Sequence, residues 1–169
     1  MDPLIGKFNL LEIENWKQHN NSVGRGKGIL TLYRTDFVWE RDVTEERYQM
    51  TKITSNSLDI INVYRSAGTD DTEFLEDLCG LASSGNQTLI VGDFNICFIS
   101  DNSSPIFKEL RNIGFKQIVK NPTHIEGHLI DLVFFRSKDT GIFYEVKQQA
   151  QYFTDHDLIE IVQGKYTSF

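Results

Sequence analysis

A run of strand-forming residues ends in an acid and an amide in the stretch TLIVGDFN, residues 88–95. Asp93 and Asn95 lie two residues apart, so an extended backbone would point both side chains to one side. Open α/β sheets bind ligands at the ends of strands, and an ionised oxygen beside a neutral amide suits a metal or water and a phosphate oxygen. Taken alone, GDFN is explained equally well as a turn, because Gly, Asp and Asn are common turn residues.

A second acid, Asp131, interrupts the apolar run LIDLVFF, residues 129–135. Burying a carboxylate costs free energy unless it has a partner. A continuous apolar run argues against an edge strand whose acid faces water. We therefore expect a partner for Asp131, and histidine is the usual candidate at a catalytic site.

The stretch FTDHDLIEI, residues 153–161, offers that histidine at the entrance to a predicted strand. His156 bonded to Asp131 would be an acid–imidazole pair, which fixes the tautomer and stabilises a charged imidazole. Asp155 would then be free as an oxygen ligand for a hard cation such as Mg²⁺. Taken alone, TDHD is better explained as a solvated loop.

The remaining histidines and the two cysteines carry less information. His19 lies in a polar stretch and is expected to be exposed, whereas His124 and His128 reach the same rim as the acids but are interpreted as structural or peripheral. Cys79 and Cys97 have no Cys or His neighbour at metal-site spacing, which predicts ordinary thiols in a reducing environment.

These residues need a scaffold of strands and helices. Asp70 or Asp71 caps one predicted helix, Ser104 and Pro105 begin the other, and Gly114 ends it. The polar stretch 20–28 is expected to be a loop. The predicted strands span 28–34, 48–53, 58–64, 88–91, 129–135, 144–149 and 157–162, and the predicted helices span 72–83 and 104–115. Strands that are apolar on both faces need a layer on each side, which predicts a layered α/β (α+β) sandwich in a single domain, residues 1–169.

Composition limits the functions to consider. The chain has 169 residues, of which 40% are apolar and 24% charged, as in globular proteins. The net charge of −7 argues against tight non-specific binding to nucleic acid, but it permits a small site at which a metal supplies positive charge. No apolar stretch is long enough to span a membrane and the N-terminus lacks a secretion signal, so we expect an intracellular, non-secreted protein.

The order of the motifs VYRSAG, LIVGDFN, THIEGHLIDLVF and TDHDLIEIV resembles the endonuclease/exonuclease/phosphatase family. Together with GRGKGI, they are most similar to the endonuclease domain of non-LTR retrotransposons, over about residues 20–162. The resemblance implies two mixed sheets packed face to face with helices outside.

The resemblance also implies roles for individual residues. Tyr64 resembles the tyrosine that contacts the scissile phosphate, Asn95 resembles the amide that holds a phosphate oxygen, and Thr123 is assigned to substrate binding.

Four further residues match the catalytic and metal-binding positions of the family. Asp93 resembles the acid that orients the attacking water, and Asp131 resembles the acid that supports the histidine. His156 would act as general base or phosphate stabiliser, with Asp155 near a Mg²⁺ or Mn²⁺ ion.

The N-terminal motifs of the family are not found. These are a strand with an asparagine and a Gln-Glu-Thr-like motif whose glutamate is the principal metal ligand. Asp2 and Pro3 match a stretch that follows this glutamate in retrotransposon relatives, so we expect the glutamate upstream of Met1 and the fold to lack the first strands. The alternative is that Glu12 or Glu14 replaces it. Missing strands would leave a neighbouring strand unpaired, and a missing glutamate would weaken Mg²⁺ binding.

The sequence therefore predicts a Mg²⁺-dependent phosphodiesterase of the endonuclease type that cleaves DNA. Two alternatives are an inactive remnant or interaction module that keeps the fold, and a phosphatase of the family. The resemblance further implies a nuclear location, and as partners a retroelement reverse-transcriptase domain or an N-terminal segment that this chain lacks.

Overall fold

The computed structural model describes residues 14–24 and 27–165. Its central element is a six-stranded sheet with the order β3-β4-β5-β6-β8-β7. β5 and β6 are parallel and the other neighbours are antiparallel, so the sheet is mixed. The strands are β3 (Val38–Thr44), β4 (Tyr48–Thr54), β5 (Leu58–Arg65), β6 (Gln87–Asp93), β7 (Lys116–Gln117) and β8 (Asp131–Arg136).

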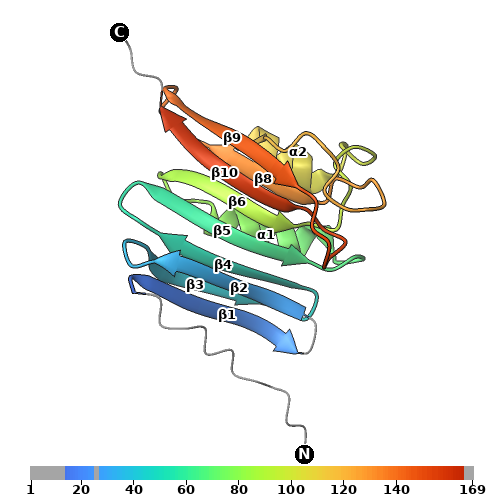
Figure 1. Cartoon of the computed structure of the whole chain (residues 1–169), viewed down its shortest axis with the longest axis horizontal. Coiled ribbons are helices and arrows are strands. Elements are labelled where there is room, and N and C mark those ends of the chain that lie inside the picture. Colours follow the sequence, from blue (N-terminus) through green and yellow to red (C-terminus); the bar gives the residue numbers. More distant parts are fainter. Residues whose placement is uncertain (1–13, 25–26, 166–169) are drawn as a thin grey trace, which may run out of the picture.

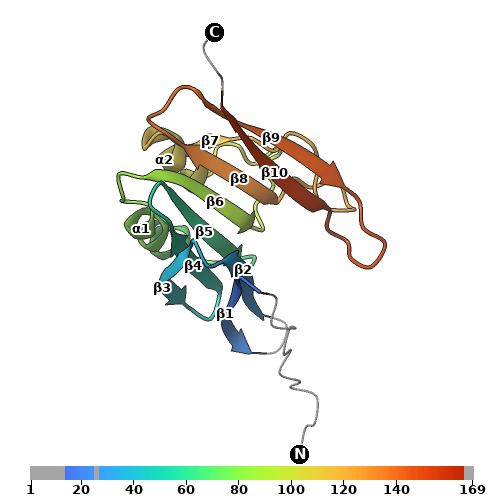
Figure 2. The same cartoon turned by 60° about the vertical axis from the view of Figure 1, so that its left-hand side comes forward.

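Two helices, α1 (Asp71–Leu81) and α2 (Pro105–Asn112), cover one face of this sheet (Figure 2). The backbone N–H groups of Thr72 and Glu73 donate to the Asp70 side chain, which confirms the expected cap of α1. Gly114 follows α2 with φ +93°, a backbone conformation that glycine adopts at low cost. Neither of these helices is long and apolar enough to cross a membrane.

The opposite face carries two antiparallel hairpins (Figure 1). β1 (Trp16–Gly24) pairs with β2 (Lys27–Arg34), and β9 (Ile142–Gln149) pairs with β10 (Leu158–Lys165). Among the described residues the hairpins are separate two-stranded sheets, so each has an unpaired edge in the second layer. The predicted α/β sandwich with helices outside is confirmed, with one mixed sheet and a second layer divided between two antiparallel hairpins.

Phe94, the aromatic residue of GDFN, anchors the end of β6 in the core. It is fully buried and its ring lies 6.0 Å from that of Phe74 in α1, 6.4 Å from that of Phe107 in α2 and 5.5 Å from that of Phe134 in β8. Edge and tilted aromatic contacts of this kind add to the stability gained from burial. The turn that carries Asp93 and Asn95 is therefore attached to both helices.

The predicted loop at 20–28 is wrong over most of its length, because β1 extends to Gly24. Asn21 is 3% exposed and donates its amide to the carbonyl groups of Val43 and Met50, both at 2.9 Å, while Thr44 Oγ1 donates to Asn21 Oδ1. Asn21 can be buried because its amide makes its hydrogen bonds within the protein. The buried position of β1 is therefore polar, and the strand lacks the alternation of apolar and polar residues that would predict it.

The prediction that His19 is an exposed loop residue is also wrong. His19 lies in β1, where its ring stacks on Trp39 at 5.2 Å and its Nε2 lies 2.5 Å from Asp42 Oδ2. The contact is made across the two layers, between residues distant in sequence, so the local polar composition did not indicate it.

Candidate active site

Tyr64, Asp93 and Asp131 form a row across three adjacent strands. Tyr64 of β5 pairs with Asp93 of β6, and Asp93 pairs with Asp131 of β8. Residues directly opposite each other in a sheet lie side by side on the same face. The structure thus brings together three of the residues singled out in the sequence.

This row lies on the face that carries the hairpins. In β8 the ring of Phe134 contacts Phe107 of α2, whereas the ring of Phe135 contacts Tyr144 of β9 at 4.5 Å. Alternate residues of a strand share a face, so Asp131 faces the same way as Phe135. The three side chains therefore point away from the helices, at the edge of the sheet where β5 and β6 end.

The GDFN stretch is both a turn and part of this rim. Gly92 has φ +142°, and a Cβ there would lie 1.9 Å from the carbonyl oxygen of Val63, so only glycine fits. Asn95 has φ +49°; its backbone N–H donates to Asp93 Oδ1 at 2.9 Å and its side-chain Nδ2 donates to Asp93 Oδ2 at 3.0 Å. Both oxygens of Asp93 are thereby held in place.

Asn95 is occupied by protein contacts in this structure. Its Nδ2 also donates to the carbonyl oxygen of Arg65 at 2.8 Å. An amide nitrogen has two hydrogens, so both are used within the protein. The predicted contact of Asn95 with a phosphate oxygen stays a prediction, and it requires one of these bonds to be exchanged.

Arg65 supports the turn from behind and was not singled out in the sequence. Its side chain is buried and donates to Asp71 Oδ1 at 2.6 Å and to the carbonyl oxygens of Thr69 at 2.8 Å and Phe94 at 3.3 Å. These bonds connect the end of β5, the start of α1 and the turn after β6. The signal in the sequence was an arginine directly after Tyr64, followed within a few residues by the capping acids.

The expected acid–imidazole pair is present at the end of the row. His156 Nδ1 lies 2.8 Å from Asp131 Oδ2. An ionised carboxylate only accepts hydrogen bonds, so Nδ1–H of His156 is the donor and Nε2 of the neutral ring keeps a free lone pair. This arrangement suits a general base.

The electrostatics of the site follow from its three acids. Burial alone lowers the pKa of His156, but the hydrogen bond and charge of Asp131, with the charges of Asp93 and Asp155, raise it above its ordinary value. Burial raises the pKa of Asp93 more than its bond from the Asn95 N–H lowers it, and the nearby charge of Asp131 raises it further. The pKa of Asp155 is lowered, by its own backbone N–H and by His124.

Backbone hydrogen bonds connect the loop before β8 to the segment before β10. Thr123 O accepts from the N–H of Asp157 at 2.8 Å, and the N–H of Ile125 donates to the carbonyl oxygen of Asp155 at 2.9 Å. Thr123 itself is fully buried, and its hydroxyl accepts from the backbone N–H groups of Ile130 at 3.3 Å and Asp131 at 3.0 Å. These contacts position the start of β8; the predicted substrate contact of Thr123 stays a prediction.

His124, interpreted from the sequence as peripheral, lies at the site. Its Nε2 is 3.3 Å from Asp155 Oδ2, and its ring centroid is 5.0 Å from that of His156. The only signal in the sequence was the Thr-His pair that precedes the Asp131 strand. Its approach to His156 depends on the backbone pairing of two segments about thirty residues apart.

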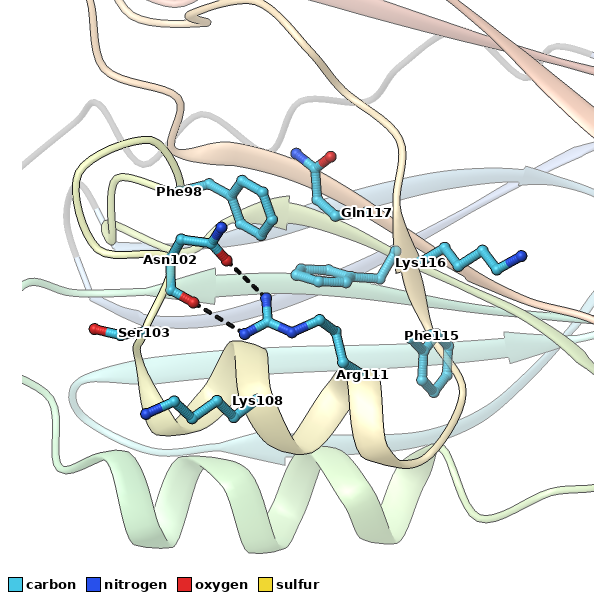
Figure 3. A pocket seen from close by; sticks show the side chains of 9 residues that line it. Phe98, Asn102, Ser103, Lys108, Arg111, Phe115, Lys116 and Gln117 are labelled. Atoms are coloured by element: carbon cyan, nitrogen blue, oxygen red, sulfur yellow. Dashed lines mark hydrogen bonds between the residues drawn. The ribbon is translucent and has the colours of Figure 1, made fainter.

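A hollow of about 650 Å³ lies elsewhere, beside α2, and none of the residues of the row lines it (Figure 3). Phe98, Phe134 and Gln117 form part of its wall, and Arg111 is held there by Asn102 through bonds of 2.7 and 2.9 Å. Three titratable groups with shifted pKa values, Asp93, Asp155 and His156, converge at the rim, so the rim and not this hollow is the candidate active site.

Comparisons of sequence find no relative: neither a family model nor a curated protein matches the chain. Comparison of structure does. The endonuclease domain of TRAS1, a telomere-specific non-LTR retrotransposon, aligns with a TM-score of 0.67 and 14% identity over 90% of this chain and 80% of that one. An endonuclease/exonuclease/phosphatase family protein of Leptotrichia buccalis aligns with a TM-score of 0.56 and 14% identity over 88% and 71%. An endonuclease/exonuclease/phosphatase family protein of Bacteroides thetaiotaomicron aligns with a TM-score of 0.54 and 10% identity over 87% of this chain and 74% of that one.

The chain has the fold of the endonuclease/exonuclease/phosphatase family. The resemblance inferred from the motifs is thus confirmed for the fold. Identities of 10–14% carry no further than this, because function depends on the site and not on the fold.

The endonuclease/exonuclease/phosphatase fold raises the question of a metal ion. In the described part of the chain His124, Asp155 and His156 offer three ligand atoms within 4.8 Å of one another, and so do His124, Glu126 and His128. Each group contains one carboxylate. Mg²⁺ takes oxygen ligands, so it would find only Asp155 in the first group and would need water and phosphate oxygens for the rest.

The sequence offers two substitutes for the family glutamate. Glu14 is exposed ahead of β1, and Glu12 lies outside the described residues.

Proposed function

We propose that this protein is a metal-dependent phosphodiesterase that hydrolyses DNA. The observation that carries the proposal is the row of Tyr64, Asp93 and Asp131 with His156 bonded to its end. The family fold supports hydrolysis of a phosphate ester, and the endonuclease domain of TRAS1 supports DNA as the substrate.

In the proposed reaction His156 acts as the general base. Its Nε2 accepts the proton of the attacking water as the water oxygen bonds to phosphorus and the bond to the leaving sugar oxygen breaks. Asp131 holds the Nδ1–H and stabilises the imidazolium that results. Asp93 orients the water, and the hydroxyl of Tyr64 donates to a phosphate oxygen.

A divalent cation held by Asp155 would neutralise charge on the phosphate and lower the pKa of the bound water. Mg²⁺ and Mn²⁺ suit the carboxylate and phosphate oxygens. Because the chain carries a net charge of −7, such a cation also reduces repulsion between the protein and a phosphodiester.

Two observations favour a second candidate, a protein that keeps the fold without turnover. Both hydrogens of the Asn95 amide nitrogen are donated, to Arg65 and to Asp93, and the metal groups each hold a single carboxylate. A binding module would require neither a free amide nor a complete metal site.

Nicking of supercoiled plasmid by the purified chain tests these candidates. Reactions contain Mg²⁺, Mn²⁺ or a chelator, and compare the wild type with His156→Ala and with His128→Ala, whose side chain is half exposed and outside the row. Metal-dependent nicking that His156→Ala loses and His128→Ala keeps supports the proposal. Absence of nicking by a folded protein would overturn it in favour of the binding module. A phosphomonoester and a phosphodiester of p-nitrophenol, assayed in parallel, separate a phosphatase from a phosphodiesterase.

A further inference from the structure

We propose that His124, Asp155 and His156 bind a transition metal of the Zn²⁺ class, and that this metal inhibits the proposed phosphodiesterase. The binding site stands on the geometry alone. The inhibition rests on the proposed function, because it requires His156 to be the general base.

The backbone holds the two histidines opposite each other. His124 and His156 form an antiparallel bridge, flanked by the hydrogen bonds Ile125 N to Asp155 O and Asp157 N to Thr123 O. In this type of pair the two residues exchange no backbone bond with each other, and their side chains approach closely on one side. The site is therefore preorganised, with ring centroids 5.0 Å apart.

The ligand atoms are close to the spacing that a zinc ion requires. His124 Nε2 lies 3.3 Å from Asp155 Oδ2, and His156 Nε2 lies 4.0 Å from Asp155 Oδ1. With metal–ligand distances near 2 Å, ligand atoms at the corners of a tetrahedron are separated by roughly 3.3 Å. One ligand atom from each of the three residues lies within 4.8 Å of the other two. Rotation of the Asp155 side chain, which is 62% exposed, can bring a single carboxylate oxygen to this spacing from both histidines and leaves a fourth position open.

The donor set selects the class of metal. Two imidazole nitrogens and one carboxylate suit Zn²⁺, Co²⁺ or Ni²⁺, whereas Mg²⁺ prefers oxygen alone. His156 also has the outer contact typical of a metal-bound histidine, because its second nitrogen donates to Asp131 at 2.8 Å. His124 Nδ1 accepts from the N–H of Glu126 at 3.2 Å, and metal binding through Nε2 moves a proton to Nδ1 and breaks this long bond.

The neighbouring group of His124, Glu126 and His128 is the competing site, because it shares His124. Its other two side chains are 71% and 52% exposed, and the rings of His124 and His128 lie nearly parallel at 6.1 Å. The described carboxylate contact of His128 Nδ1 is with Glu126 at 4.0 Å, against 2.8 Å between His156 and Asp131, so the His128 ring is held less firmly for a metal. The structure favours the group that contains His156.

Occupation of this site removes the lone pair that the proposed reaction needs. The metal bonds to His156 Nε2, and this nitrogen can then no longer accept a proton from water. Zn²⁺ is therefore expected to inhibit even when Mg²⁺ or Mn²⁺ is in excess.

Titration of the chelator-treated full chain with Co²⁺ tests the binding without any assay of turnover. Tetrahedral Co²⁺ has a ligand-field absorption in the visible range, and Zn²⁺ should displace it. We expect one Co²⁺ per chain, with affinity at least about tenfold lower in His124→Ala, His124→Asn and His156→Ala, since even loss of an outer contact costs 10–100-fold. His128→Ala is the matched control and should bind as the wild type does. Circular dichroism confirms that each variant is folded.

Two outcomes would overturn the site. In one, the folded wild type shows no Co²⁺ absorption; in the other, His128→Ala weakens binding as strongly as His156→Ala, which assigns the metal to the neighbouring group. Inhibition is measured separately, as the ratio of nicking rates with and without Zn²⁺ for each protein. A third outcome separates the two proposals: the wild type binds Co²⁺, His124→Ala does not, and the wild type never nicks DNA. This result would support the metal site and reject both the phosphodiesterase and its inhibition.

Discussion

His156 Nδ1 lies 2.8 Å from Asp131 Oδ2, although the two residues are 25 positions apart in the chain. Asp131, which begins β8, and His156, which lies just before β10, thus form one hydrogen-bonded pair. Each explains the other: the imidazole satisfies a half-buried acid, and the acid selects the tautomer in which Nε2 is free.

Replacing Asp131 by Asn should lower the pKa of His156 and reduce nicking at least about 100-fold, because the amide removes the charge that stabilises the imidazolium. NMR titration of the His156 ring measures the first effect, and plasmid nicking measures the second. Asp139→Asn, in the exposed loop between β8 and β9, serves as the control. A pKa of His156 that stays the same in Asp131→Asn would contradict the electrostatic role of the pair.

The raised pKa of His156 predicts opposite effects of pH on activity and stability. A general base must be neutral, so the nicking rate should rise as pH increases through the raised pKa of His156. The protonated ring is favoured in the folded state, so its contribution to stability is complete below the unfolded pKa of about 6.5 and is lost as pH rises through the folded pKa. Urea unfolding of the wild type and His156→Ala at several pH values measures this. A stability difference that grows with pH would have the wrong sign.

Two glycine replacements should have opposite effects on stability. Gly92→Ala places a Cβ 1.9 Å from the carbonyl oxygen of Val63, in a backbone conformation with φ +142°, and should cost at least about 1–3 kcal/mol. Gly80→Ala lies within α1 with no heavy atom near its Cβ, and should stabilise the protein by about 0.5–1 kcal/mol. Urea unfolding measures both. A Gly92→Ala protein as stable as the wild type would contradict the close approach of β5 and β6 at the rim.

The two thiols should react at different rates. Burial raises the pKa of Cys97, but hydrogen bonds from the Ser100 hydroxyl and from backbone N–H groups lower it to about 7, whereas burial raises the pKa of Cys79. The thiolate is the reactive form, so iodoacetamide near neutral pH should alkylate Cys97 first. Mass spectrometry of peptides after short labelling times shows the order, and Ser100→Ala should slow the labelling of Cys97. Equal labelling of both thiols would reject the assigned hydrogen bonds.

Much of the scaffold could be predicted from the sequence, because its signals are local. β5, β6 and β8 are covered on both faces, so their apolar runs are nearly continuous. The pair Asp70 and Asp71 predicted the start of α1, where Asp70 is the cap, because a cap needs only its own helix. Asp93 and Asp131 could be singled out because an acid at the end or in the middle of such a run is costly without a partner.

The elements that were missed are those whose stability comes from distant residues. The polar stretch 20–28 predicts a loop, although β1 extends to Gly24, because the buried position of this strand is Asn21, whose amide donates to carbonyl groups of β3 and β4. β7 has two residues, too few for any pattern. Alternation of apolar and polar residues indicates a strand only when the buried positions are apolar. A strand whose buried position is polar therefore shows no alternation in the sequence.

The sequence by itself determined which residue types stand at the strand ends: the acids, the amide and the histidine of the candidate active site, in an order that resembles one family. Only the tertiary structure decided the register of the strands, the hydrogen bond from the Asn95 amide to the carbonyl oxygen of Arg65, and the approach of His124 to His156. The physical reason is that side-chain chemistry and strand preference are encoded locally. Distances of 3 to 5 Å between segments far apart in the chain depend instead on how the layers pack.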